Sequence, residues 1–358
     1  MNKDRTDRIF KLMKYKNIPQ LIVSDPASIF YITGKWIHPG ERLLVLYLNV
    51  NGNNKLFINE LFPLSEDLEV EKIWLKDTDD GVSIMSKYID AKLPIGIDKN
   101  WPSKFLLKLM ELKPGSTFVN GSEILDRVRM CKDKQERKYM REASKLNDIA
   151  MDKLIKSISA KYSEKDMAGI LVDIYRDIGA DGVSFDPIIA YGVNGANPHH
   201  EIDNSVLKEG DSITIDIGCI KNSYCSDMTR TVFYKRVPDH SRLVYNIVRE
   251  ANERGIKAVR PGVRFCDIDA AARNYIEEKG YGKYFTHRTG HSIGIECHDL
   301  GDVSGANTEK VEPGMIFSIE PGVYIPGKVG IRIEDLVLVT EDGCEVLNHY
   351  TKDIIVIE

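Results

Sequence analysis

Two carboxylates lie in a stretch that otherwise has the pattern of a buried sheet. Isoleucines alternate with polar residues over Ile213–Ile217, with Asp216 among the polar ones, and this period of two predicts a half-buried strand. Residues 221–223 (Lys-Asn-Ser) predict a turn, after which a second strand is expected to carry Asp227. A carboxylate among core residues is destabilising unless it is paired, hydrogen-bonded or bound to a cation. The two acids therefore raise the question of whether the chain binds a cation here.

A later part of the chain repeats this arrangement. Residues 207–216 read Leu-Lys-Glu-Gly-Asp-Ser-Ile-Thr-Ile-Asp, and residues 311–320 read Val-Glu-Pro-Gly-Met-Ile-Phe-Ser-Ile-Glu, so each copy has an acid six residues after its glycine. In each copy a second acid follows, Asp227 in the first and Glu334 in the second. The parallel indicates an internal duplication, with coincidence between two strand-and-turn segments as the alternative. A duplication would let two hairpins, each with two acids, face one another across a pseudo-twofold axis.

A histidine-containing stretch lies between the two pairs of acids. His287 and His291 have the i, i+4 spacing of a helical zinc motif, but the neighbouring Gly290 and Gly294 disfavour a helix. We therefore expect a strand or a glycine-rich loop. One imidazole from this stretch and the four acids would form an oxygen-rich set of five ligands. Such a set suits two divalent ions, because carboxylates favour harder cations such as Mn2+ while an imidazole also suits Co2+, Fe2+ or Zn2+.

Taken singly, each of these residues has a more ordinary interpretation. A strand Asp or Glu is usually exposed or ion-paired, and a lone histidine is usually a satisfied core or surface group. The matching contexts of the four acids favour the metal site. Three of them (Asp216, Glu320 and Glu334) lie within apolar runs, where an unpaired carboxylate would be destabilising by several kcal/mol.

The elements that must position these residues fall into two predicted domains, residues 1–125 and 126–358. The charged segment 127–138 is expected to be a solvated linker that leads into a long helix. The first domain is predicted to be α/β and contains no residues with catalytic spacing. Its strands are expected at 21–23, 43–48, 55–58, 72–75, 95–98 and 117–119, and its helices at 3–16 and near 81–88 and 102–112.

Composition limits the classes of partner. The 358 residues carry a net charge of -5, which argues against a surface built for nucleic-acid phosphates and leaves small or peptidic partners. The charged first ten residues and the absence of a long apolar run predict a cytoplasmic protein with neither signal peptide nor membrane span. The six cysteines are too dispersed for zinc-type pairs and too few for a disulfide scaffold, so reduced thiols are expected.

Five motifs together resemble those of the pita-bread-fold metallopeptidases of family M24, in the branch of Xaa-Pro aminopeptidases and Xaa-Pro dipeptidases (prolidases). The family takes its metal ligands from Asp-x-Gly, Ser-Asp-x-Thr-Arg, Gly-His-x-x-Gly, Glu-Pro-Gly and Arg-x-Glu-Asp. The matching residues are Asp216, Asp227, His291, Glu320 and Glu334. The resemblance extends over nearly the whole chain, since Ser24-Asp25-Pro26 followed by Tyr31-Ile-Thr-Gly34 is similar to the creatinase-type N-terminal domain.

The resemblance implies a fold and a reaction. The fold would be an α/β N-terminal domain and an α+β pita-bread domain with an internal pseudo-twofold duplication. The reaction would be hydrolysis of the peptide bond before proline, by a hydroxide that bridges two divalent ions. Manganese is the favoured ion, with cobalt, zinc or iron open. The substrates would be small peptides with proline at the second position, and the protein would be a homodimer.

Further positions carry over to the chemistry. His199, in Asn-Pro-His, and His298, seven residues after His291, resemble the family's active-site histidines, Glu320 is a candidate for proton relay, and Arg332 would fix the neighbouring acids. His200, His287 and Arg288 are expected to be bystanders. The chain departs from the family at three positions without losing a ligand; these are Asn197, Ser292 and Asp299.

A different class of function has the same architecture. Some pita-bread proteins are peptide-binding or regulatory modules that have lost their ligands, and creatinase works without a metal. All five ligands are present here, which favours the enzyme. The sequence leaves open whether the protein would be a dipeptidase or an aminopeptidase.

Overall fold

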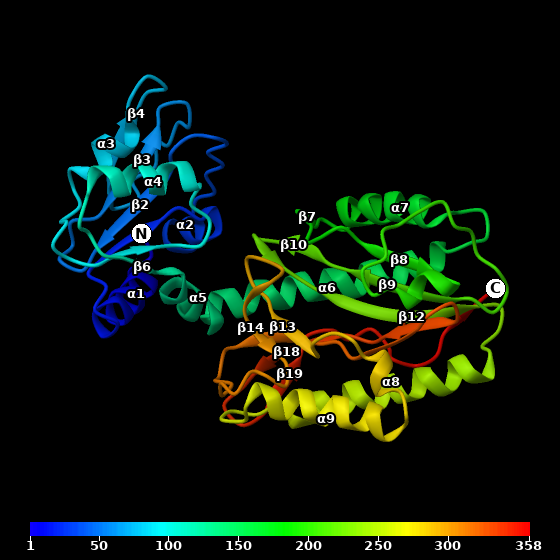
Figure 1. Ribbon diagram of the computed structural model, residues 1–358. Helices are drawn as coiled ribbons and strands as arrows, with labels where there is room; N and C mark the ends of the chain where they lie inside the picture. Colours follow the sequence, from blue (N-terminus) through cyan, green and yellow to red (C-terminus); the bar gives the residue numbers. More distant parts are fainter. The chain divides into compact units, whose positions relative to one another are not determined.

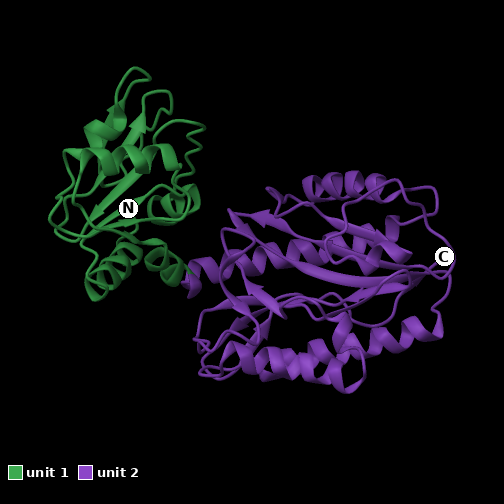
Figure 2. Cartoon of the chain, in the orientation of Figure 1, with its two compact units in different colours: residues 1–129 green, residues 130–358 purple.

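The computed structural model describes residues 1–358 (Figure 1). The chain divides into two compact units, residues 1–129 and 130–358 (Figure 2). Each unit has its own sheets and its own hydrophobic core. None of the helices is both long enough and apolar enough to cross a membrane.

Unit 1 is an α/β unit built on one mixed sheet of six strands. Its elements are α1 (Lys3–Tyr15), β1 (Gln20–Val23), α2 (Pro26–Thr33), β2 (Val45–Asn49), β3 (Lys55–Asn59), β4 (Glu71–Leu75), α3 (Gly81–Ser86), β5 (Ile95–Ile97), α4 (Ser103–Leu112), β6 (Phe118–Asn120) and α5 (Ser122–Met130). The strand order is β4-β3-β2-β1-β5-β6, and β1 is antiparallel to β2 but parallel to β5. Val82 and Met85 of α3 and Leu109 of α4 pack in one buried cluster with Ile22 and Phe57 of the sheet.

Helix α2 was not expected from the sequence, which indicated only that a strand ends before Pro26. The helix begins there because the Asp25 carboxylate accepts a hydrogen bond from the Ser28 amide (2.9 Å), and because proline is well suited to the first helical position. It ends at Gly34, whose φ of 73° is the left-handed conformation common after a helix. The Asp-Pro pair was therefore a helix start signal as well as a strand stop signal.

Segment 127–138 is not the solvated linker that its charges predicted. Arg129 and Lys132 are 2% and 1% exposed. Arg129 lies 3.4 Å from an Asp25 oxygen within unit 1, and Lys132 lies 3.5 Å from an Asp299 oxygen within unit 2. The prediction was wrong because both cations have carboxylate partners that are distant in the sequence, and paired charges can be buried.

Unit 2 consists of two halves with the same order of elements, a pair of helices followed by a set of strands. The first half contains α6 (Lys134–Ser157), α7 (Glu164–Asp177), β7 (Gly182–Val183), β8 (Ile188–Tyr191), the short 3-10 helix η1 (Gly192–Ala196), β9 (Ser212–Ile217), β10 (Cys219–Lys221), β11 (Tyr224–Cys225) and β12 (Met228–Tyr234). The second half contains α8 (Asp239–Ala258), α9 (Phe265–Glu278), η2 (Gly282–Tyr284), β13 (Gly290–Ser292), β14 (Asp299–Val303), β15 (Ile316–Ile319), β16 (Gly322–Ile325), β17 (Val329–Arg332), β18 (Asp335–Val339), β19 (Cys344–Val346) and β20 (Val356–Ile357).

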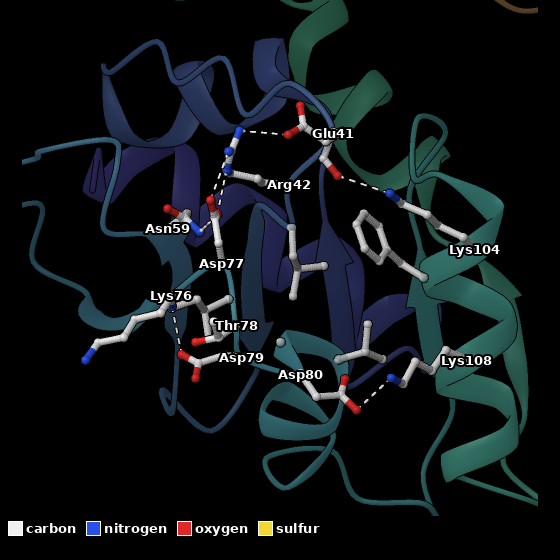
Figure 3. Close-up of a pocket in the computed structure, with 15 residues that line it drawn as sticks. Glu41, Arg42, Asn59, Lys76, Asp77, Thr78, Asp79, Asp80, Lys104 and Lys108 are labelled. Atoms are coloured by element: carbon white, nitrogen blue, oxygen red, sulfur yellow. Dashed lines mark hydrogen bonds and ion pairs between the residues drawn. The ribbon is translucent and has the colours of Figure 1, made fainter.

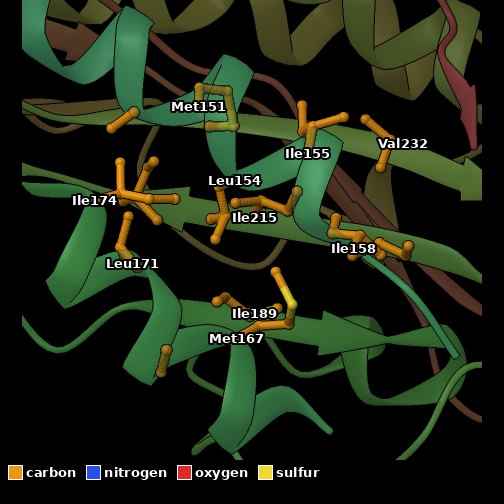
Figure 4. Close-up of a cluster of buried hydrophobic side chains, with 14 of the residues drawn as sticks. Met151, Leu154, Ile155, Ile158, Met167, Leu171, Ile174, Ile189, Ile215 and Val232 are labelled. Atoms are coloured by element: carbon orange, nitrogen blue, oxygen red, sulfur yellow. The ribbon is translucent and has the colours of Figure 1, made fainter. Parts of the chain in front are cut away.

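Each helix pair covers the strands of its own half. In the first half, Leu154 of α6 and Leu171 of α7 pack against Ile189 of β8 and Ile215 of β9 (Figure 4). In the second half, α8 and α9 pack against β16 and β17. The two halves thus bury separate cores and leave their strands to meet between the helix layers (Figure 1).

Each half of unit 2 has a buried asparagine that makes the same kind of hydrogen bond. Asn147 on α6 donates to the carbonyl of Ile217, beside Asp216 (2.8 Å). Asn252 on α8 donates to the carbonyl of Ile319, beside Glu320 (2.8 Å). Both side chains are fully buried, so each ties a helix to the backbone that carries an acid.

Strand β9 is buried on both faces rather than on one. All of Ser212–Ile217 is buried, because its isoleucines pack against α6 and α7 and its polar side chains face the strands of the second half. For example, the Thr214 hydroxyl donates to the carbonyl of Gly330 (3.2 Å). Asp227 also departs from expectation, since it lies between β11 and β12 and not within a strand.

Candidate metal centre

The strands of the two halves bring five side chains to one pocket of about 550 Å³. Each predicted ligand comes from a strand or from the residues next to one. The five are Asp216 in β9, Asp227 before β12, His291 in β13, Glu320 after β15, and Glu334 between β17 and β18. The other three predicted site residues, His199, His298 and Arg332, line the same pocket.

Backbone pairing across the two halves explains the convergence. Thr229 of β12 stands opposite Asp216 of β9, and its carbonyl accepts a hydrogen bond from the amide of Glu334 (3.1 Å). The amide of Glu320 donates to the carbonyl of Thr289 (2.7 Å), next to the strand that carries His291. The acids of one half are therefore held beside those of the other by main-chain hydrogen bonds.

Several donor atoms are spaced as around a cation, and three carboxylate oxygens lack a protein partner. His291 Nε2 lies 3.6 Å from Asp227 Oδ2 and 3.7 Å from Glu320 Oε1. Donor atoms of Asp227, His291 and Glu334 all lie within 4.8 Å of one another. Three buried oxygens have no hydrogen-bond partner, namely Asp216 Oδ1, Asp227 Oδ1 and Glu334 Oε1. Unpartnered buried carboxylate oxygens are costly, so this donor set fits divalent cations.

The electrostatics of the pocket favour the same interpretation. Burial, followed by repulsion from neighbouring carboxylates, raises the pKa of Asp227 and of Glu334 well above the usual range. Burial also raises the pKa of Glu320 to about 7. Burial lowers the pKa of His291 to about 3, so its imidazole is neutral and has a lone pair available for a metal. A bound cation would stabilise the ionised form of these carboxylates, which burial otherwise disfavours.

Arg332 fixes the acids from within the protein. Its Nη2 donates to Asp216 Oδ2 (2.6 Å), and its Nε donates to the Thr229 hydroxyl (3.1 Å). That hydroxyl in turn donates to Glu334 Oε2 (2.7 Å). One guanidinium thus orients an acid from each half, and each acid keeps its other oxygen for the pocket.

The two remaining predicted histidines lie at the opening of the pocket and are exposed. The ring of His298 is centred 4.2 Å from the ring of His291. His199 follows η1, and this segment lies directly against β17. Arg332 Nη1 donates a hydrogen bond to the carbonyl of Pro198 (3.3 Å). The backbones at Gly195 and Gly330 are so close that a β-carbon added to Gly330 would lie only 1.6 Å from the Gly195 carbonyl oxygen.

Sequence reasoning missed a buried tyrosine and misjudged two neighbours. The Tyr324 hydroxyl accepts from Arg332 Nη1 (2.9 Å) and bonds His287 Nε2 (2.8 Å). His287 and Arg288 line the pocket and are not bystanders. Burial, followed by the charge of Arg332, lowers the pKa of His287 to about 4, which keeps this imidazole neutral. The period-two spacing Glu320, Gly322, Tyr324 was the signal that could have placed the tyrosine beside the ligands.

His200 does lie apart from the metal ligands. Its Nε2 bonds a Glu164 oxygen at 2.7 Å, and that carboxylate also accepts from the amides of Tyr191 and Asp203. A cation could contact Glu164, His200 and Asp203, but the carboxylate is already satisfied by donors from the protein. This cluster organises the loop after η1.

Unit 1 contains a hollow of about 650 Å³ with a different character (Figure 3). Its charges are engaged with one another. Arg42 donates to both oxygens of Asp77 (2.8 and 3.1 Å), and Lys108 pairs with Asp80 (2.6 Å). These pairs are exposed and offer no group that is poised for chemistry.

Comparison with known proteins agrees with this arrangement. Residues 138–341 match the metallopeptidase family M24, and residues 5–131 match the creatinase/prolidase N-terminal domain. An uncharacterized peptidase of Staphylococcus haemolyticus is 33% identical, over 97% of this chain and 99% of its own. The chain belongs to metallopeptidase family M24.

Solved structures of similar proteins cover the whole chain. A prolidase from Thermococcus sibiricus superposes with a TM-score of 0.94 at 31% identity, covering 100% of this chain and 99% of its own. An X-Pro aminopeptidase from Thermotoga maritima gives 0.85 at 29% identity, covering 98% and 100%. A Xaa-Pro dipeptidase from Bacillus anthracis gives 0.90 at 28% identity, covering 99% of each chain. The predicted fold, a creatinase-type N-terminal domain and a pita-bread domain, is confirmed.

Proposed function

We propose that the protein hydrolyses the peptide bond before proline in small peptides, using two divalent ions. Asp216, Asp227, His291, Glu320 and Glu334 would be the ligands. The observation that supports this most strongly is the group of three unpartnered buried carboxylate oxygens beside a neutral imidazole. Manganese is the proposed ion because carboxylates outnumber imidazoles in the ligand set four to one.

The acids would have different roles, in metal binding and in proton transfer. When bound, the ions would supply Lewis acidity and make water a usable nucleophile near neutral pH. Asp216 and Glu334 would each offer an unpartnered oxygen to the ions, since Arg332 and Thr229 hold the other oxygen of each. Glu320, with a pKa raised to about 7 by burial, is suited to accept a proton from the attacking water and deliver it to the leaving nitrogen.

The histidines at the opening of the pocket would bind and orient the substrate. His199 and His298, which line the pocket, would donate to the scissile carbonyl as negative charge develops on it, or hold the leaving nitrogen. A proline nitrogen carries no N–H, so selectivity before proline depends on the shape of the wall around the ring. Phe185 and Ile188 give that wall apolar surface.

The first test is hydrolysis of Ala-Pro, Ala-Pro-Ala and Met-Ala-Ala by metal-stripped protein, with and without added Mn2+ or Co2+. We expect cleavage of the proline peptides only after metal is restored. The ratio of Ala-Pro to Ala-Pro-Ala cleavage distinguishes a dipeptidase from an aminopeptidase. Folded protein that cleaves none of them with any metal would instead support a peptide-binding or regulatory module.

A further inference from the structure

A buried glutamate on α7 binds the segment that carries His199. Glu164 is the first residue of α7, and its side chain is fully buried. Its carboxylate accepts four hydrogen bonds, two at each oxygen, and none of them comes from a lysine or an arginine. The donors are the Tyr191 amide and Asn194 Nδ2 at Oε1 (2.8 and 2.9 Å), and His200 Nε2 and the Asp203 amide at Oε2 (2.7 and 3.0 Å). All four donors belong to residues 191–203, so one carboxylate holds both ends of this segment.

The position of His199 depends on its neighbours in the chain. Its ring makes no hydrogen bond within the protein and is exposed at the opening of the pocket. On one side of it, the carbonyl of Pro198 accepts a hydrogen bond from Arg332 Nη1 (3.3 Å). On the other side, the ring of His200 donates to the Glu164 carboxylate (2.7 Å). The backbone of His199 is therefore held from two directions, by Arg332 and by Glu164.

The hydrogen bonds at Glu164 require a carboxylate and not an amide. Each of its oxygens faces a main-chain N–H, that of Tyr191 at Oε1 and that of Asp203 at Oε2. A carboxylate accepts at both oxygens, whereas a glutamine carries an NH2 group in place of one of them. In either orientation this NH2 group would face a main-chain donor, so hydrogen bonds on one side would be lost. Glu164→Gln should therefore loosen the segment without leaving a cavity.

We propose that Glu164 is a positioning residue, which acts through His200 to hold the His199 imidazole beside the scissile peptide bond. The inference rests on the proposed function, in which His199 contacts the substrate. Neither Glu164 nor His200 lines the pocket, so both act on the reaction only through the segment that they hold. Because catalysis depends steeply on the orientation of the groups that contact the substrate, loosening this segment should reduce turnover.

A double-mutant cycle tests whether the effect passes through His199. Hydrolysis of Ala-Pro by the Mn2+-loaded protein is measured for wild type, E164Q, H199A and the E164Q/H199A double variant. We expect kcat to fall about tenfold in E164Q, with KM and metal content unchanged. In the H199A background the same substitution should change kcat by less than about twofold, because the imidazole that it would misplace is absent. H200A, at a side chain that is 12% exposed, should behave like E164Q and provides the same test if E164Q does not fold.

Asp148→Asn is the matched control. Asp148 lies on α6 and accepts hydrogen bonds from the main-chain amides of His349 and Tyr350 (2.9 and 3.1 Å). None of these three residues lines the pocket, so the control removes a similar link between a helix and a distant segment. We expect D148N to lower the free energy of unfolding and to leave kcat unchanged in both backgrounds.

Two results would overturn the positioning role while leaving the proposed function intact. The first is a wild-type kcat in both E164Q and H200A. The second is an equal fall in kcat in the wild-type and H199A backgrounds, which is the pattern of a general loss of structure. Folded wild type that cleaves no proline peptide with any metal would overturn the proposed function, and the positioning role would fall with it.

Discussion

At the scale of single residues, burial decides the state of the ionisable groups. Carboxylates and imidazoles in the same pocket shift in opposite directions, since burial raises the pKa of Glu320 and lowers that of His291. Both shifts favour neutral forms, which is the expected response of a low-dielectric site that lacks its counter-charge. The residue-scale predictions separate groups that would bind metal from groups that would bind substrate.

Replacing Glu320 by Gln should leave a folded protein with very low turnover. The amide keeps an oxygen near the other ligands but cannot accept a proton, so kcat should fall by about 10²–10⁴. Steady-state hydrolysis of Ala-Pro, together with metal analysis, measures this. A kcat near that of the wild type in a Glu320→Gln protein would show that this carboxylate does not relay the proton.

Replacing His298 by Ala should reduce kcat by about 100-fold while leaving the metal content unchanged. The imidazole is proposed to stabilise charge on the substrate and not to bind an ion. The matched control is His240→Ala, which removes an exposed histidine from α8. Loss of metal from His298→Ala would assign the residue to the ligands instead.

The metal-free protein should lose stability as pH rises. A carboxyl whose folded pKa is raised contributes stability that is complete below its unfolded pKa and is lost as pH passes its folded pKa. For Glu320 these values are 4.5 and about 7, so its own contribution, on the order of 3 kcal/mol, is lost in that window. The lowered pKa values of His287 and His291 act in the opposite direction, but only below about pH 6.5, so chemical denaturation from pH 6.5 to 8 tests the loss from the acids. Saturating Mn2+ should abolish the trend, and a metal-free protein of constant stability would contradict the burial of the acids.

At the scale of elements, a small number of buried hydrogen bonds connect the helices to the backbone beside the predicted ligands. Asn252 of α8 donates to the carbonyls of Ile319 (2.8 Å) and Ile333 (3.4 Å), the residues before Glu320 and Glu334. Its own carbonyl oxygen accepts from Lys352 (2.8 Å). A fully buried side chain thus joins a helix to both acids of the second half.

Replacing Asn252 by Ala should lower the free energy of unfolding by about 1–3 kcal/mol, since the two carbonyls and the Lys352 ammonium lose a buried partner. It should also weaken metal binding, because the backbone that carries both acids loosens. Urea denaturation and metal titration measure the two effects. Asn53→Ala, at an exposed turn of unit 1, is the control. Equal stability in both variants would show that α8 does not position the acids.

The sequence predicted the elements better than their surroundings. Period-two alternation located β9, but not that both of its faces are buried, because that depends on contact with β17 of the other half. All eight predicted site residues line one pocket, because the motifs fix their place on the strands and on the connections beside them. Tyr324 was missed because its bond to His287 joins two separate segments, and only its place beside the ligands could have been inferred from the spacing.

At the scale of the whole molecule, the proposed metals should stabilise only part of the chain. All five proposed ligands belong to unit 2, while unit 1 has its own sheet and core. A ligand that binds only the folded state stabilises it by about 2.7 kcal/mol at one hundred times its dissociation constant. That stabilisation should therefore appear in the sheets of unit 2.

Hydrogen exchange with and without Mn2+ tests this expectation. We expect slower exchange in β9, β12, β13 and β15 when metal is present, and unchanged exchange in β1–β6. Added NaCl at the same ionic strength controls for salt. Equal slowing in both units would indicate that the metal acts on the chain as a whole.

The close approach of Gly195 and Gly330 limits how the pocket can diversify. Because any side chain at Gly330 would collide with the Gly195 carbonyl, the contact between the backbone that leads to His199 and the strand that carries Arg332 requires glycine at this position. Changes in substrate preference should therefore come more readily from exchanging side chains around this contact, as at Asn197, than from re-routing the loop. Laboratory evolution of this enzyme should then accumulate point substitutions around the pocket opening and reject insertions between η1 and His199.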